Sequence, residues 1–171
     1  MYQEGRGYSA LRRGRVSVPE ATYFVTLCVQ GNGQRLDSAD MILSVHSVLL
    51  ALEEDGSIVL RVATIMPDHV HLLFRLKERL TFSRVIARFK AKTWADLAKR
   101  GLRWQENVFE RRLRPDEPVL PVFHYIFMNP YRAKLLQGFE KWPGFRCGVE
   151  DWEWFQHHLD KDCPYPEWLG D

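Results

Sequence analysis

Two histidines lie two residues apart in an alternating apolar segment, and this segment constrains the fold more than any other part of the chain. In a β-strand the side chains at positions i and i+2 lie on the same face, about 7 Å apart. The pattern therefore predicts a strand with one apolar face and with both imidazoles on the other face, within reach of one divalent ion. The segment reads Met66-Pro67-Asp68-His69-Val70-His71-Leu72-Leu73-Phe74.

Charge is distributed unevenly along the chain, although the formal net charge is only +2. Residues 75–114 carry 13 Lys and Arg against 4 Asp and Glu, whereas residues 140–171 carry 3 against 8. A basic segment of this kind attracts a phosphate backbone, so it predicts a nucleic-acid partner. A solvated basic helix face is the competing interpretation.

Length and composition predict one domain over residues 1–171, with a basic arm at 1–17 and an acidic, Trp-rich tail at about 146–171. The hydrophobic fraction of 46% is that of a globular protein. The three cysteines form no CxxC pair, and no run of 18 apolar residues or signal-peptide core is present. We therefore expect a cytoplasmic protein without a membrane partner or an organic cofactor.

Hydrophobic periodicity predicts an α+β fold in the order β-α-β-β-α-β, which is that of a ferredoxin-like antiparallel sheet with two helices on one face. A further helix containing Tyr125 is then left to cover the other face, above the two histidines. In the second helix, Phe82, Val85, Phe89, Trp94 and Leu97 are the expected core positions. The expected elements are strand 21–29, helix 37–54, strands 57–66 and 69–76, helix 81–100, a fourth strand within 103–114, helix 119–128 and a helical turn at 130–136.

A tyrosine that faces a two-histidine metal site indicates a specific chemistry. Tyr125 and Asn129 are four residues apart, so they share one face of a continuous helix. A metal ion held by His69, His71 and the Asn129 amide would act as a Lewis acid on a phosphate oxygen. The Tyr125 hydroxyl would attack phosphorus and hold one DNA end as a phosphotyrosine. Imidazole and oxygen ligands suit Mg²⁺ or Mn²⁺.

Each of these residues also has a structural interpretation. Two histidines on a strand are often packed residues without a ligand, and Tyr125 can be a core aromatic. Asn129 precedes Pro130, and Asn followed by Pro is a natural helix start in which the amide acts as an N-cap. The residues alone leave these alternatives open.

The octapeptide Met66 to Leu73 resembles the His-hydrophobic-His (HUH) motif of single-tyrosine transposases of the IS200-like kind. Tyr125-Ile126-Phe127-Met128-Asn129-Pro130 resembles the tyrosine segment of the REP-associated tyrosine transposases. Smaller similarities occur at Ala21–Thr26, Trp104-Gln105 and Lys141-Trp142-Pro143, so the resemblance covers about residues 10–145. It departs at Lys134, where the family often has Gly, and after Pro143.

The resemblance implies a metal-dependent endonuclease and strand transferase that acts on single-stranded DNA folded into imperfect palindromic hairpins. Tyr125 would be the nucleophile, and His69, His71 and Asn129 the metal ligands. The basic residues would position the DNA through its phosphates, and Trp104 and Tyr131 are candidates for base stacking. The candidate DNA-binding residues are Arg12, Arg13, Arg84, Arg88, Lys92, Arg111, Arg112 and Arg114.

Other functions stay open. A non-catalytic hairpin-binding protein could use the same scaffold with a degenerate site. A histidine-triad nucleotide hydrolase would have a third alternating histidine at position 73, where Leu73 stands. A replication initiator or relaxase shares the metal–tyrosine chemistry but usually has a longer chain. The protein is expected to act as a monomer or a dimer.

Overall fold

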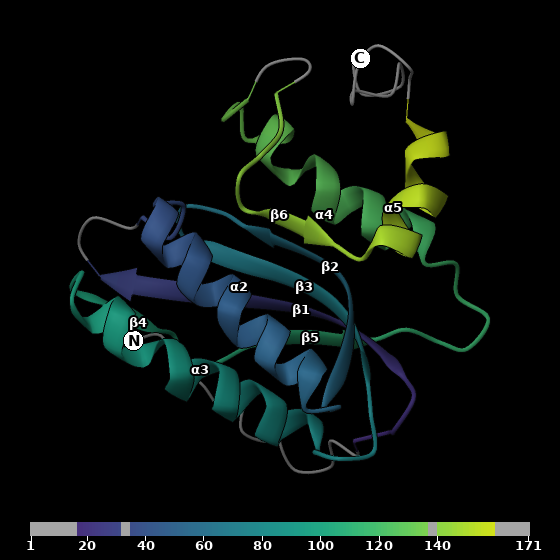
Figure 1. Cartoon of the computed structure of the whole chain (residues 1–171), viewed down its shortest axis with the longest axis horizontal. Coiled ribbons are helices and arrows are strands. Elements are labelled where there is room, and N and C mark those ends of the chain that lie inside the picture. The colour runs from purple at the N-terminus through teal and green to yellow at the C-terminus, as the bar shows by residue number, and fades with distance from the viewer. Residues whose placement is uncertain (1–16, 32–34, 137–139, 160–171) are drawn as a thin grey trace, which may run out of the picture.

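The computed structural model describes residues 17–31, 35–136 and 140–159 (Figure 1). Arg12 and Arg13 of the predicted basic arm lie outside the described residues, as does the end of the predicted tail. None of the helices in the described part is long and apolar enough to cross a membrane. The strands are β1 (Thr22–Gly31), β2 (Ile58–Ile65), β3 (His69–Leu76), β4 (Leu102–Trp104), β5 (Phe109–Arg112) and β6 (Phe145–Cys147). The helices are α2 (Ala39–Glu54), α3 (Phe82–Ala98), α4 (Leu120–Arg132), α5 (Val149–Phe155) and the 3₁₀ turn η1 (Gln156–His158).

The strands form one antiparallel sheet in the order β4-β1-β3-β2-β6, and β5 also pairs with β1. The first four positions of this order, together with the sequence order β-α-β-β-α-β, confirm the predicted ferredoxin-like α+β fold. The predicted fourth strand is divided in two, because β4 pairs with Val29–Gly31 and β5 with Tyr23–Thr26 of the same strand. Residues 105–108 between them leave the ladder.

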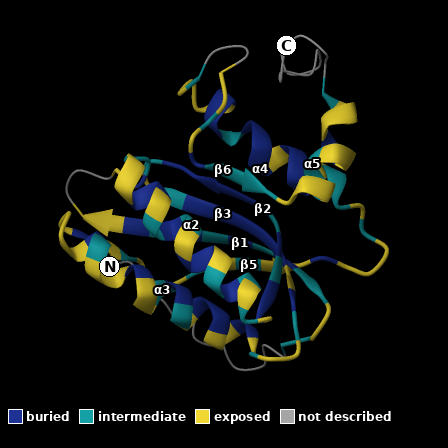
Figure 2. Ribbon diagram, viewed as in Figure 1, coloured by how far each residue is buried: buried dark blue, intermediate teal, exposed yellow. Residues whose placement is uncertain are grey.

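Helices α2 and α3 cover one face of the sheet, as Figure 1 shows. Alternate residues of β1 and β3 point into this layer, where Val25, Leu27, Val70 and Phe74 are at most 2% exposed. Helix α3 begins at Thr81, whose hydroxyl accepts a hydrogen bond from the Arg84 backbone N–H. Such alternation yields a continuous core on this face, coloured dark blue along the strands in Figure 2.

The expected core of α3 is confirmed at Phe82, Val85, Phe89 and Leu97, which are all buried. The expectation for Trp94 is wrong, because its side chain is 64% exposed. On a helix of 3.6 residues per turn, Thr93 takes the inward position instead, and its hydroxyl donates to the Phe89 carbonyl.

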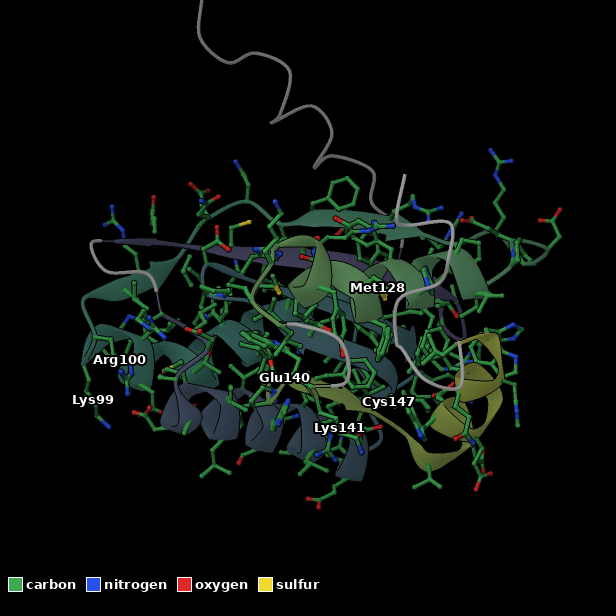
Figure 3. The ribbon with its side chains drawn as sticks, turned by 90° about the horizontal axis from the view of Figure 1, so that it is seen from above. Lys99, Arg100, Met128, Glu140, Lys141 and Cys147 are labelled. Atoms are coloured by element: carbon green, nitrogen blue, oxygen red, sulfur yellow. The ribbon has the colours of Figure 1, made fainter. Side chains whose placement is uncertain are left out.

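Helix α4 covers the opposite face of the sheet, as predicted, and α5 packs against it (Figures 1 and 2). A second apolar cluster forms between the sheet, α4 and α5, and Phe123 and Phe155 are fully buried in it. The ring centroids of Phe123 and Phe155 are 4.5 Å apart. In Figure 3, Met128 on α4 lies well away from Lys99 and Arg100, which follow α3 in the other layer.

The two candidates for base stacking, Trp104 and Tyr131, both form hydrogen bonds within the protein. The Trp104 indole N–H donates to the Thr93 hydroxyl at 2.8 Å and packs on Phe89. Tyr131 is 3% exposed, and its hydroxyl donates to the Glu140 carbonyl at 2.8 Å. A ring that is 3% exposed offers no face to a base, so the expectation for Tyr131 is wrong. Trp104 is half-buried, and base stacking on its ring stays a prediction.

Candidate active site

The two histidines are brought together by the register of three strands. His71 lies opposite Thr26 of β1 on one side and opposite Thr64 of β2 on the other, so all three side chains share the α4 face of the sheet. The Thr26 hydroxyl is 2.9 Å from His71 Nδ1. His69 Nδ1 is 2.6 Å from the Asp68 carboxylate, and the Nε2 atoms of the two histidines are only 3.1 Å apart.

Partners on both Nδ1 atoms leave the two Nε2 atoms facing each other. The Asp68 carboxylate can only accept, so His69 Nδ1 donates, and neutral His69 then has its lone pair on Nε2. Burial, reinforced by the charge of His69 and opposed by Asp68, lowers the pKa of His71 to about 3. His71 and the neutral form of His69 can therefore direct lone pairs to one point, with Thr26 accepting from His71 Nδ1.

This donor set fits a divalent cation. Two ligands about 2.2 Å from an ion and at right angles to each other are about 3.1 Å apart, which is the separation observed between the Nε2 atoms. Nδ1 partners of this kind fix ring orientation in metal sites. No third His, Cys, Asp or Glu joins the pair in the described part of the chain. The remaining ligands would have to be an amide, water or substrate oxygens.

Tyr125 lies directly above the histidine pair. Its ring centroid is 5.3 Å from that of His71 and 6.0 Å from that of Phe24 on β1. The Arg132 guanidinium is 5.6 Å from the same ring, two turns further along the same stripe of α4. The Tyr125 side chain is 39% exposed, so it is open to a large substrate while its ring is held at the edge of His71.

A proline inside α4 explains how the helix is fixed over the sheet. Pro130 has no N–H, so the Ile126 carbonyl four residues earlier loses its helical hydrogen bond. The buried Thr64 hydroxyl donates to this carbonyl at 3.0 Å. Thr64 and Thr26 thus flank His71. Thr64 fixes the helix that carries Tyr125, and Thr26 fixes the His71 imidazole.

The continuity of α4 corrects two expectations about Asn129. The helix runs unbroken from Leu120 to Arg132, so the separate helical turn predicted from 130 to 136 does not form. Asn129 is an interior, half-buried residue of α4 and not an N-cap. It lies one turn after Tyr125 on the same stripe, which leaves its amide available to the site.

The comparisons with known proteins agree with this architecture. The family model described as "Transposase IS200 like" matches residues 17–113, more than half of the chain. This chain belongs to the IS200-like transposase family. The match ends before α4, so it covers both histidines of the transposase but not Tyr125.

A solved REP-associated tyrosine transposase bound to a REP hairpin has the same fold as this transposase. It superposes with a TM-score of 0.62 at 18% identity, over 72% of this chain and 74% of the other. A putative transposase from Deinococcus radiodurans R1 matches at 14% identity with a TM-score of 0.46, over 78% of this chain and 92% of the other. No curated protein matches significantly.

The predicted DNA-binding residues of the transposase fall into two groups. Arg84, Arg88 and Lys92 lie on α3, across the sheet from Tyr125, and Arg88 forms an ion pair with Asp55. Arg111 shares the α4 face, because it pairs in register with Phe24, whereas Arg112 points to the opposite face. An open cleft of about 560 Å³ at this sheet edge is lined by residues between Arg111 and Pro118, and in it Arg111 contacts Glu117.

Sequence reasoning missed three contributors to the site. The sequence identifies Thr64 only as a residue of a strand. A proline at position 130 of a helix does indicate, however, that the carbonyl of residue 126 lacks its helical donor and needs another. Asp68 was assigned to a turn, although an acid next to the first histidine is a common imidazole partner. Arg132, seven residues after Tyr125, is on the same helical stripe, and this spacing was the available signal.

Proposed function

We propose that this transposase cleaves and rejoins single-stranded DNA through a covalent phosphotyrosine at Tyr125. The observation that supports this most strongly is the 5.3 Å contact between the Tyr125 ring and His71, whose Nε2 converges with that of His69. A nucleophile and a cation site must be adjacent if both are to act on one phosphate. The exposure of Tyr125 and the burial of His71 match these two roles.

His69, His71 and Asn129 would hold Mg²⁺ or Mn²⁺. When bound, the ion would polarise a phosphate oxygen and neutralise negative charge at phosphorus. Asp68 and Thr26 would accept hydrogen bonds from the two Nδ1 atoms and so keep both imidazoles correctly rotated, with each Nε2 directed at the ion.

The chain's own residues would carry out the transfer. The Tyr125 hydroxyl gives its proton to solvent, and its oxygen forms a bond to phosphorus as the bond to the neighbouring sugar oxygen breaks. That sugar oxygen takes up a proton and leaves as a hydroxyl. Because one phosphoester replaces another, the energy of the bond is kept, and a hydroxyl of a second DNA end can reverse the reaction.

Hairpin DNA is the proposed substrate, supported by the hairpin bound to the structural neighbour of the same fold. Arg111 and Arg114 would contact phosphates beside the active site, because β5 lies at the sheet edge next to Phe24. Arg112, which points to the opposite face, would contact DNA that passes around this edge. Arg12 and Arg13 would add contacts from the arm. Arg84, Arg88 and Lys92 would contribute only where DNA passes around the edge to the α3 layer.

A covalent-adduct assay tests the proposal. The protein is incubated with labelled hairpin oligonucleotides from the flanks of its own gene and with Mg²⁺ or Mn²⁺, and label that stays on protein is measured on a denaturing gel. We expect an adduct with wild type and none with Tyr125→Phe or with the double variant His69→Ala/His71→Ala. Tyr131→Phe, a buried tyrosine of the same helix, is the matched control and should keep the adduct.

The same assay separates catalysis from binding alone. Tight hairpin binding by every variant with no adduct in any metal would favour a non-catalytic hairpin-binding protein. An adduct that persists in Tyr125→Phe would assign the nucleophile elsewhere.

A further inference from the structure

A second cleft lies beside Tyr125, and neither His69 nor His71 is among its lining residues. It has a volume of about 510 Å³ and is open to solvent. Its walls combine an apolar patch, the nucleophile candidate and three nitrogen-bearing side chains. The lining residues are Leu120, Pro121, His124, Tyr125, Arg132 and His158.

The cleft is built by two elements that are remote in sequence. Helix α4 supplies five of the lining residues, and η1 supplies His158. Phe155 anchors this second element, because it is fully buried and lies 4.5 Å from Phe123 and 5.1 Å from Phe127 between ring centroids. An ion pair of 2.5 Å between Arg61 and Asp151 ties α5 to β2.

Three basic side chains, those of His124, Arg132 and His158, meet in this cleft. Burial, and after it the charges of Arg132 and His158, lower the pKa of the His124 imidazole. The three side chains are therefore close enough to interact electrostatically. Within the described residues, Arg132 and His158 have no carboxylate within ion-pair distance. Arg132 instead lies over the Tyr125 ring, with its guanidinium carbon 5.6 Å from the ring centroid.

We propose that this cleft is a phosphate subsite, which holds the DNA phosphate next to the one that Tyr125 attacks. The inference rests on the proposed function and adds where the neighbouring nucleotide lies. A guanidinium and two imidazole N–H groups match the oxygens of one phosphodiester, and the apolar wall formed by Leu120 and Pro121 accommodates its sugar.

The subsite gives the C-terminal segment a role in the reaction. Because α5 and η1 are held against α4 by Phe155, His158 reaches a position beside the nucleophile that the α4 sequence alone does not provide. Fixing the neighbouring phosphate sets which phosphate stands over the histidine pair. Arg132 and His158 are therefore positioning residues for the cleavage register.

Binding measured without cleavage tests the subsite. Full-length protein in EDTA is titrated with hairpin oligonucleotides that each carry one neutral methylphosphonate near the cleavage point. We expect the affinity of wild type to fall about tenfold at one flanking position, as for the loss of one charge-assisted contact. Arg132→Gln should lose about as much with unmodified DNA and show no further loss at that position.

Further variants distinguish the subsite from general charge. His158→Gln, on a different element, should reduce the position-specific penalty about threefold, and Arg132→Lys should restore part of it. Arg103→Gln, an exposed arginine on β4, should keep the full penalty. Because Arg132 and His158 lie on separate elements, misfolding of one variant leaves the other as a test.

The outcomes separate this inference from the proposed nucleophile. An unchanged penalty at every position in both Arg132→Gln and His158→Gln would overturn the subsite, even where the covalent adduct forms normally. A penalty that disappears in both variants would support the subsite even where the adduct assay shows no covalent product.

Discussion

The two faces of the sheet differ in how completely the side chains are buried, although the same strands supply both. On the α2 and α3 face, Val70 and Phe74 of β3 are fully buried in apolar contacts. On the α4 face, His69 and His71 of the same strand meet a tyrosine that is 39% exposed. Stability is concentrated on one face and polar chemistry on the other, because strand alternation sends successive residues to opposite sides.

The largest expected effect contrasts one residue from each face. Phe74→Ala should lower the free energy of unfolding by about 3–5 kcal/mol, because it leaves a cavity among Tyr23 and Phe82. Tyr125→Phe should change it by less than about 0.5 kcal/mol. Urea denaturation measures both. If Tyr125→Phe lowered the free energy of unfolding as much as Phe74→Ala does, the result would show that Tyr125 acts as a core aromatic residue.

The second prediction concerns pH and the metal-free protein. The pKa of His71 is lowered to about 3 in the folded state from about 6.5 when unfolded, so the unfolded state binds more protons between these values. The contribution of neutral His71 to the free energy of unfolding should be complete above pH 6.5. It should be lost as the pH falls toward 3. Thermal melts across this range should show a weaker decline for His71→Gln than for wild type.

The third prediction concerns the hydrogen bond that joins Thr64 of β2 to helix α4. Thr64→Val removes the donor to the Ile126 carbonyl and should cost about 1–3 kcal/mol. In a Pro130→Ala background residue 130 regains its N–H, so the same change should cost clearly less. A double-mutant cycle by urea denaturation measures the coupling. Additive costs would show that Thr64 does not compensate for Pro130.

The fourth and smallest effect is stabilisation by metal. Mn²⁺ at about ten times its Kd should add about 1.4 kcal/mol, or roughly 3–6 °C in Tm. The shift should disappear in His69→Ala/His71→Ala and be reduced in Asp68→Asn, which leaves both ligands in place but removes the carboxylate partner. An equal Tm shift in the double variant would place metal binding outside the histidine pair.

The sequence predicts the fold well because its signals are local and periodic. The alternation around His69 and the apolar stripe of α2 each determine which side of an element is buried. The division between β4 and β5 depends on how both strands align with β1, and Trp94 depends on how α3 is rotated. These are tertiary properties that local periodicity does not contain.

The candidate site was predictable only where one element carries its residues. His69 with His71, and Tyr125 with Asn129, are each defined by spacing within a strand or helix. Thr26 and Thr64 flank His71 through strand register, and His158 approaches Arg132 through the packing of Phe155 on α4. The polar partners that orient the site come from elements remote in sequence, so no single motif reveals them.

The most direct test of the account is to map the covalent bond. The protein is reacted with hairpin DNA and metal and digested with nuclease and trypsin, and the peptide spanning residues 113–132 is fragmented in a mass spectrometer. We predict a nucleotide attached through phosphate to Tyr125, with Tyr131 on the same peptide unmodified. Attachment to any other residue, or an unmodified peptide from protein that has cleaved the DNA, would contradict the central claim that Tyr125 is the nucleophile.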